Sequence, residues 1–264
     1  MTPVEVVKGE GPVILGLPHT GTFVPDDIHS RLNARGRELS DTDWHIHRLY
    51  DGLLPGATTV RATFHRYVVD ANRDPSGASL YPGQNTTGLV PLTDFDGAAI
   101  WADPPRAADI AARKDAFHTP YHAALQAEME RVRATHGVAI LYDCHSIRSV
   151  IPHLFEGLLP DFNIGTNMGT TCAPEIEAAV LGICAGATGY THVLNGRFKG
   201  GWTTRHYGRP DQGFHAIQME LAQSTHLVDE TAGWAYAPDK ADRLRPHLSR
   251  ILTTLADLAP KLKG

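Results

Sequence analysis

The stretch that decides the fold is Val138-Ala139-Ile140-Leu141-Tyr142-Asp143, which continues into Cys144-His145-Ser146. A short apolar run of this kind, rich in β-branched residues, is typical of a strand buried in a sheet. A second such run, Val13-Ile14-Leu15-Gly16-Leu17, leads into the turn Pro18-His19-Thr20-Gly21. Each of these two predicted strands therefore has a histidine at its carboxyl end.

Outward from these two runs, the chain alternates between strand-like and helix-like patterns. Further strands are predicted at 58–63, 67–70, 161–165 and 214–221. Helices are predicted at 26–37 (short), 44–53, 107–135 with a break near Pro120, 174–187, and 239–262 as one helix or a pair. This alternation predicts an α/β fold with helices on both faces of the sheet. No linker divides the chain, so residues 1–264 are expected to form a single catalytic domain.

Composition and charge narrow the possible functions. The chain has 264 residues, of which 42% are hydrophobic and 20% charged, and its formal net charge is −5. A mildly acidic protein has no general attraction for nucleic acid or for anionic membranes, so we expect neither partner. Three cysteines form no C-x-x-C pair, and no signal peptide or membrane-length apolar run is recognisable. We therefore expect reduced thiols and a cytoplasmic protein. The sequence does not predict an oligomeric state.

Polar residues with catalytic chemistry gather where the predicted strands end. His19 and His145 follow two of the strands, Asn72-Arg73 follows the predicted strand at 67–70, and Glu220 lies late in another. Ligands of open α/β sheets bind outside the carboxyl ends of the strands. We therefore expect these side chains to share one site for a small molecule.

Two histidines at strand ends and a carboxylate near a helix start would make a three-ligand metal site with a position left for water. His19, Asp43 and His145 fit this inventory, although Asp43 could instead be only a helix cap. Asp41 competes with Asp43, and Asp143 could be a ligand or could orient His145. Zinc is the ion we expect, while the ligand types would also accept another divalent transition metal.

The other candidate residues are a buried carboxylate and a set of cations. Glu220 lies in a strand that is otherwise apolar, where a carboxylate is either paired with an arginine or functional as a general base. Five cations lie in Gly-rich loops, where guanidinium groups can bind carboxylates in a bidentate way. They are Arg73, Arg197, Lys199, Arg205 and Arg209.

Several of these stretches together resemble the N-formylglutamate amidohydrolase family. The matching segments run from near the N-terminus past Glu220 and so cover most of the chain. They are Leu17-Pro18-His19-Thr20-Gly21, Asp41-Thr42-Asp43-Trp44, Val68-Val69-Asp70-Ala71-Asn72-Arg73-Asp74-Pro75, Asp143-Cys144-His145-Ser146, Asp161-Phe162-Asn163-Ile164-Gly165, Asn195-Gly196-Arg197-Phe198-Lys199-Gly200-Gly201, Thr204-Arg205-His206-Tyr207-Gly208 and Gln218-Met219-Glu220-Leu221.

The resemblance implies a mixed, mostly parallel sheet flanked by helices, similar to the zinc carboxypeptidases and aspartoacylase. It implies that His19 and His145 bind zinc, that Asn72 and Arg73 contact substrate, and that Glu220 is the general base. Carboxypeptidases carry a glutamate ligand three residues after the first histidine, where this chain has Thr22. Asp43 is therefore our choice for the third ligand.

The implied reaction is hydrolysis of N-formyl-L-glutamate to formate and L-glutamate by a zinc-activated water, the last step of a histidine degradation route. Arg73 would help to stabilise the oxyanion. Substrate binding is expected from Asn72, Arg73, Asn195, Arg197, Lys199, Arg205 and Tyr207.

Three alternatives remain open on the sequence. The substrate could be another N-acyl acidic amino acid, or the chain could bind small dicarboxylates without turnover. A metal-free amidase could use Cys144 as its nucleophile. Cys144 and His145 are adjacent on an extended strand end, so their side chains should point to opposite faces, which disfavours a dyad between them.

Overall fold

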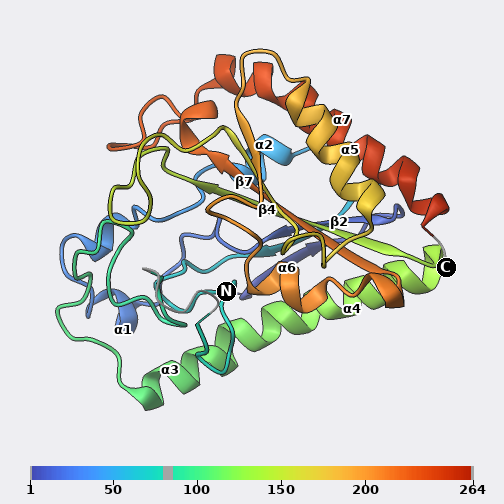
Figure 1. Ribbon diagram of the computed structural model, residues 1–264. Coiled ribbons are helices and arrows are strands. Elements are labelled where there is room, and N and C mark those ends of the chain that lie inside the picture. The colour runs from blue at the N-terminus through green and yellow to red at the C-terminus, as the bar shows by residue number, and fades with distance from the viewer. Residues whose placement is uncertain (1, 80–85, 263–264) are drawn as a thin grey trace.

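The computed structural model describes residues 2–79 and 86–262, and one sheet of seven strands runs through them (Figure 1). The strands follow the order β1-β3-β2-β4-β7-β5-β6. Their bounds are β1 Val4–Val7, β2 Val13–Leu17, β3 Thr58–Ala62, β4 Ala139–Ile147, β5 Phe162–Gly165, β6 His192–Leu194 and β7 Phe214–Ala222. Strands β3, β2, β4 and β7 are parallel to their neighbours within this group, whereas β1 and β5 run antiparallel to β3 and β7. The predicted α/β fold with a mixed, mostly parallel sheet is confirmed.

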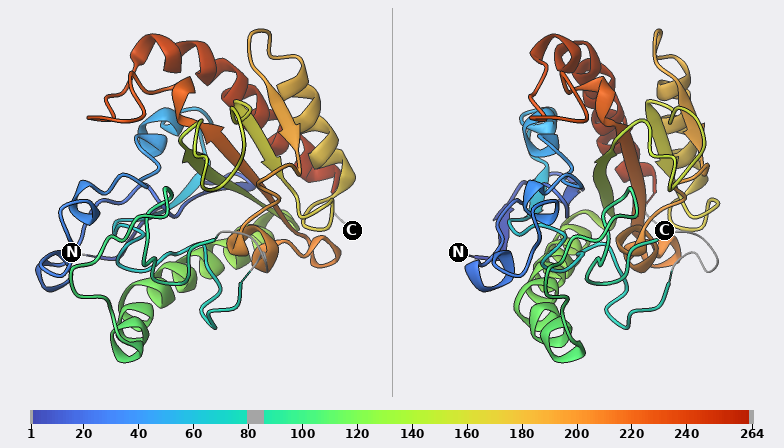
Figure 2. Two further views of the ribbon diagram at one scale, coloured as in Figure 1. Left: turned by 60° about the vertical axis from the view of Figure 1, so that its left-hand side comes forward. Right: turned by 90° about the vertical axis from the view of Figure 1, so that its left-hand side faces the viewer.

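Helices cover both faces of this sheet. They are α1 Asp26–His29, α2 Ile46–Tyr50, α3 Ala107–Arg113, α4 Thr119–His136, α5 Pro174–Ala185, α6 Trp202–Tyr207 and α7 Pro238–Leu258. Helix α4 lies on one side of the sheet, and α5 and α7 lie together on the other (Figures 1 and 2). Within the described ranges, no helix combines the length and the apolar character that a membrane crossing requires.

The two faces of strand β4 separate core from site. Ile140, Tyr142 and Cys144 pack into the hydrophobic cluster under α5 and α7. Ala139 and Leu141 pack into the cluster under α4. Because side chains alternate along a strand, Asp143 and His145 continue the α4 face at the carboxyl end of β4. In β7, Gln218 and Glu220 continue that same face after the buried Ala216.

The prediction of a strand at 67–70 is wrong. This segment is fully buried, but its backbone pairs with loops: the Val68 N–H donates to the His65 carbonyl at 2.9 Å and the Asp70 N–H to the Leu89 carbonyl at 2.7 Å. An apolar run records burial, and burial under a loop produces the same pattern as burial in a sheet.

Other differences lie at element ends and in loops. The long helix predicted at 107–135 does break near Pro120, because a π-helical turn, Lys114–His118, separates α3 from α4. Proline has no N–H to continue the helical ladder, and a widened turn accommodates that loss. Helix α6 was not predicted within the Gly-rich loop at 195–210, and the short edge strands β1 and β6 were not predicted either. The closing segment forms one helix, α7, followed by a 3₁₀ turn.

Candidate functional site

Two histidines and an aspartate meet beyond the carboxyl ends of two parallel neighbours, β2 and β4. His19 follows β2 by two residues, His145 lies near the end of β4, and the Asp43 N–H donates to the His19 carbonyl at 3.1 Å. The two Nδ1 atoms are 3.2 Å apart. Asp43 Oδ2 lies 3.2 Å from the Nδ1 of His145 and 3.8 Å from that of His19. These three side chains, all buried, form what we call the His-Asp-His cluster.

The far nitrogen of each ring faces a second buried carboxylate. His19 Nε2 lies 2.7 Å from Asp70 Oδ1, and His145 Nε2 lies 3.1 Å from Asp143 Oδ1. A carboxylate oxygen accepts from a ring N–H, and a histidine that donates from Nε2 in this way has its Nδ1 lone pair available to a metal ion. Thr204 Oγ1 donates to the other oxygen of Asp143 at 2.9 Å and holds that carboxylate in place.

The cluster fits a divalent metal ion. Four ligands at tetrahedral zinc distances of about 2.0–2.1 Å lie about 3.3 Å from one another, which is close to the separations within the cluster. Although burial acts to raise the pKa of Asp43, hydrogen bonds from His145 and His19 hold it well below its usual range, so this carboxylate is ionised. In the part of the chain that the structure describes, it is the one group of three such side chains able to hold a metal.

Asp41 lies outside the cluster. Its Oδ2 accepts a hydrogen bond from the Phe95 N–H at 3.0 Å, and burial raises its pKa to about 7. Asp143 is placed to orient His145 through Nε2. Of the carboxylates considered from the sequence, Asp43 is therefore the one placed with the two Nδ1 atoms.

The position of Asp43 depends on contacts with distant parts of the chain. The Ser146 N–H donates to Asp43 Oδ2 at 3.1 Å. The next residue, Trp44, stacks on Trp234 with ring centroids 5.0 Å apart. The Trp44 carbonyl accepts a hydrogen bond from His226 Nε2 at 3.0 Å. The segment that follows β7 therefore fastens the loop that carries Asp43.

A pocket of about 270 Å³ opens over the cluster. His19, His145 and Glu220 are among the residues that line it. Three guanidinium groups line it as well, from Arg66, Arg73 and Arg197. The apolar part of the wall consists of Leu89, Phe95, Ile147, Leu154 and Phe198. A pocket with several cations beside a metal-type cluster suits a small anionic molecule.

Glu220 lies beside the cluster on the neighbouring strand, where it is in register with His145. Its Oε2 accepts a hydrogen bond from Gln218 Nε2 at 3.1 Å. Burial raises the pKa of Glu220 to about 8, and the charge of Asp43 adds to this effect. Within the described residues Glu220 forms no ion pair with an arginine, so the alternative of a structural salt bridge has no support there.

Arg66 is the pocket residue that the sequence did not suggest. Its side chain is buried, its Nη2 lies 2.8 Å from His19 Nε2, and its guanidinium lies 4.9 Å from the centre of the Phe95 ring. The cations expected from the sequence lie in Gly-rich loops, whereas Arg66 directly precedes the buried run at 67–71. A cation beside a fully buried run is costly unless it is paired, and that was the available signal.

Asn72 and Arg73 both line the pocket. Asn72 Nδ2 lies 3.2 Å from His145 Nε2, and Asn72 Oδ1 accepts the Thr203 N–H at 2.8 Å. Arg73 donates from Nε to the Thr87 carbonyl and from Nη2 to Thr87 Oγ1, both at 3.0 Å. Arg197 also lines the pocket, and its Nε donates to the Leu154 carbonyl at 3.0 Å.

Four other residues expected to bind substrate do not line this pocket as the structure describes it: Asn195, Lys199, Arg205 and Tyr207. Asn195 Oδ1 accepts the Thr166 N–H at 3.0 Å, and Arg205 Nε donates to the Gly200 carbonyl at 2.9 Å. Tyr207 is buried against His122. Contact of these four residues with substrate stays a prediction.

Comparison with known proteins gives one consistent family. Residues 11–227 match the family model described as N-formylglutamate amidohydrolase. The chain is 46% identical over 251 residues to the N-formylglutamate deformylase of Pseudomonas aeruginosa, an alignment that covers 94% of each chain. It is 44% identical to that of Pseudomonas putida, with 94% of this chain and 93% of the relative covered.

Solved structures agree with this similarity. The crystal structure of an N-formylglutamate amidohydrolase from Ralstonia eutropha JMP134 superposes with a TM-score of 0.82 at 26% identity, and 99% of each chain is covered. A protein from Agrobacterium tumefaciens at 19% identity has a TM-score of 0.70, with 97% of this chain and 96% of that chain covered. The second comparison supports the fold alone.

The cluster generates a prediction about metal binding. Chain stripped by a chelator should bind one Zn²⁺, measured by isothermal titration calorimetry at pH 7.5. Asp43→Asn should weaken binding by more than about 100-fold, since loss of a ligand exceeds the cost of losing a supporting hydrogen bond. Asp41→Asn is the matched control and should bind as the wild type does. Undiminished affinity in Asp43→Asn would place the third ligand elsewhere.

The cysteines generate a second prediction. Cys144, Cys172 and Cys184 are all buried, and burial raises the pKa of each thiol. A raised pKa keeps a thiol protonated and unreactive at neutral pH. Iodoacetamide at pH 7.5 should therefore label none of the three in native protein and all three in guanidinium, as counted by mass spectrometry. Rapid native labelling of Cys144 would restore the cysteine amidase as a candidate.

Proposed function

The chain belongs to the N-formylglutamate amidohydrolase family, and we propose that it hydrolyses N-formyl-L-glutamate to formate and L-glutamate with the help of a divalent metal ion, zinc first among them. The observation that carries the proposal is that the His-Asp-His cluster and Glu220 face one pocket that three arginines also line. The relatives' name, N-formylglutamate deformylase, supports the choice of substrate.

His19, Asp43 and His145 would hold the metal. When bound, the ion would supply Lewis acidity, which makes a water molecule more acidic and polarises a carbonyl oxygen. The contribution of the chain is to keep both Nδ1 lone pairs and one Asp43 oxygen pointed at the same place. Asp70 and Asp143 do this for the two rings through their contacts with Nε2.

Glu220 is the general base of the proposed reaction. Its carboxylate accepts a proton from the attacking water and then gives that proton to the nitrogen of the leaving glutamate. A carboxyl group with a raised pKa is a better proton acceptor than an ordinary one, and burial provides that rise here. Gln218 holds one oxygen of Glu220 and leaves the other for the water.

The arginines match the charges of the substrate. N-formyl-L-glutamate has two carboxylates, and its acyl oxygen gains negative charge during attack. In the proposed reaction Arg73 stabilises that oxygen together with Arg66, which contacts the ring of His19. Arg197 enters the same pocket from a different loop and would bind a carboxylate of the glutamate moiety.

The wider assignments are also proposals. They comprise a single catalytic domain over residues 1–264, a cytoplasmic location, and a place at the end of histidine degradation. The same cations would also bind another N-acyl acidic amino acid. Comparing the rates of substrates that differ in their acyl group identifies the acyl group that the enzyme prefers. A cysteine mechanism is disfavoured because Cys144 faces the opposite side of β4 from His145.

The proposal predicts metal-dependent release of formate. Zinc-loaded protein should release one formate for each N-formyl-L-glutamate, coupled to formate dehydrogenase and read at 340 nm. Activity should disappear with a chelator and return when Zn²⁺ is added. N-acetyl-L-glutamate is the control substrate; it yields acetate instead of formate, so its hydrolysis is followed by the release of L-glutamate, which should be slower. No turnover from folded, zinc-loaded protein would contradict the substrate, and turnover without any metal would contradict the mechanism.

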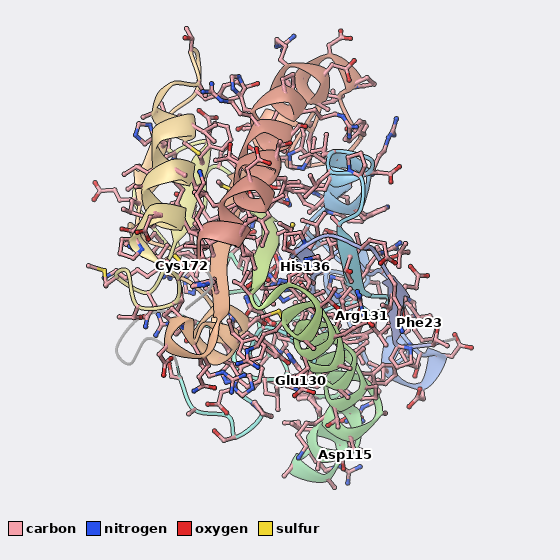
Figure 3. All side chains as sticks on the ribbon, turned by 90° about the vertical axis from the view of Figure 1, so that its right-hand side faces the viewer. Phe23, Asp115, Glu130, Arg131, His136 and Cys172 are labelled. Carbon is pink, nitrogen blue, oxygen red and sulfur yellow. The ribbon has the colours of Figure 1, made fainter. Side chains whose placement is uncertain are left out.

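The role of Glu220 gives a separate prediction. Glu220→Gln should lower kcat by about 10²–10⁴-fold, the usual contribution of a general base, with zinc content unchanged. Glu130→Gln, an exposed substitution on α4 (Figure 3), is the control and should retain wild-type kcat. Near-normal kcat in folded Glu220→Gln would exclude Glu220 as the base.

A further inference from the structure

Two histidines on the helix layer below the pocket hold the backbone of the Asn72-Arg73 segment. His118 ends the π-helical turn, and His122 lies in the first turn of α4. His122 Nε2 lies 2.7 Å from the Ala71 carbonyl oxygen, and His118 Nε2 lies 3.0 Å from that of Arg73. A carbonyl oxygen only accepts, so both ring nitrogens donate.

Asn72 lies between these two fastened carbonyls. Its own carbonyl accepts a hydrogen bond from Arg73 Nη1 at 3.0 Å, so three consecutive carbonyls each have a side-chain donor. The Asn72 side chain is held as well, between His145 and the Thr203 N–H at the start of α6. An added Cβ at Gly201 would lie 2.2 Å from Asn72 Nδ2, which shows how closely α6 approaches this amide.

The two histidines are neutral donors. Burial lowers the pKa of His122 to about 3 and also lowers that of His118. The Tyr207 hydroxyl lies 3.1 Å from both His122 Nδ1 and the His122 carbonyl. Trp202 closes the group, with its ring centroid 4.7 Å from that of His122. The Ala71 carbonyl, which only accepts, requires the tautomer of His122 that carries its proton on Nε2, and the α6 side chains hold the ring in place.

We propose that His118 and His122 are positioning residues that set Asn72 and Arg73 for the substrate. This inference rests on the proposed function, because it takes Asn72 and Arg73 as the residues that meet the substrate. Neither histidine lines the pocket as described, so their effect passes through the Ala71–Arg73 backbone. Without the hydrogen bonds from His122 and His118, the Ala71 and Arg73 carbonyls lose the donors that hold this backbone against the helices.

The chain contains a matched control for this role. His136 lies at the other end of α4 (Figure 3), and its Nε2 lies 2.9 Å from the Glu10 carbonyl. The bond is of the same kind, on the same helix, and it is remote from the pocket. If histidine-to-carbonyl bonds only stabilise the fold, His136→Leu and His122→Leu should change the same measurements.

The first measurement is steady-state kinetics on N-formyl-L-glutamate with zinc-loaded His118→Leu, His122→Leu and His136→Leu. His118→Leu and His122→Leu, the two pocket-side variants, should each lose about tenfold or more in kcat/KM. The loss should come chiefly from a higher KM, because Asn72 and Arg73 bind substrate before and during the reaction. His122→Gln places an amide N–H where Nε2 was and should recover kcat/KM to within about threefold. His136→Leu should keep the wild-type KM.

The second measurement is hydrogen–deuterium exchange of peptides that span residues 70–74, which needs no substrate. Exchange there should accelerate in His118→Leu and His122→Leu but not in His122→Gln or His136→Leu. His122→Asn, whose shorter amide does not reach the Ala71 carbonyl, replaces any Leu variant that fails to fold.

The outcomes separate the two proposals. Wild-type KM and wild-type exchange in the folded pocket-side variants would overturn the positioning role. Equal effects in His136→Leu would also overturn it, because they would show a general loss of stability. If the wild-type protein releases no formate, the proposed function fails, and the exchange measurement alone then decides whether the two histidines hold this segment.

Discussion

The constraint on which this structure depends is the burial of negative charge at the end of the sheet. Asp43, Asp70 and Asp143 are at most 1% exposed, and all three surround two histidine rings. Burying a carboxylate without a compensating partner costs roughly several kcal/mol of folding free energy. The neighbours of these three aspartates are therefore placed where they can donate hydrogen bonds or supply positive charge. Asp70 and Asp143 each face the Nε2 of one ring, and Asp43 faces the two Nδ1 atoms. Arg66 and Arg73 lie 3.7 Å and 3.9 Å from Asp70 Oδ2 and supply part of the compensating positive charge. A divalent cation beside the two Nδ1 atoms would supply more, which favours the proposed metal centre.

Strand β4 is the element that joins stability to chemistry. One of its faces belongs to the core under α5 and α7 and ends in Cys144. The other face covers α4 with apolar residues and then ends in Asp143 and His145. The rigidity that a functional site needs comes from the core below it, because a ligand whose backbone is fixed in a central strand loses little freedom on binding. The same reasoning applies to Glu220 in β7.

The site residues on loops are held in place by contacts with distant segments instead of by a strand backbone. Asp43 and Asn72 lie outside the strands, and each is held by hydrogen bonds and ring contacts from residues that are distant in sequence. The segment after β7 fastens the Trp44 side of Asp43, and helices α4 and α6 hold Asn72 from two sides. These contacts fix the positions of the loop side chains more closely than the loop backbone alone would.

The sequence by itself determined the fold class and the chemical inventory of the site. Apolar runs that end in histidines predicted the two central strands, and His19, Asp43, His145 and Glu220 could be named because their side-chain chemistry is a local property. The spacing of residues alone did not distinguish Asp43 from Asp41. The apolar pattern at 67–70 predicted a strand where the chain forms a buried loop, and Arg66 was not among the cations that the sequence predicted. The tertiary structure placed Asp43 beside the two Nδ1 atoms, gave residues 67–70 a loop backbone and put Arg66 in the pocket lining. Asn195, Lys199, Arg205 and Tyr207 are not among the residues that line the pocket as described. The physical reason is that residue type and periodicity record whether a side chain is buried, whereas which atoms meet depends on how segments far apart in the chain pack together.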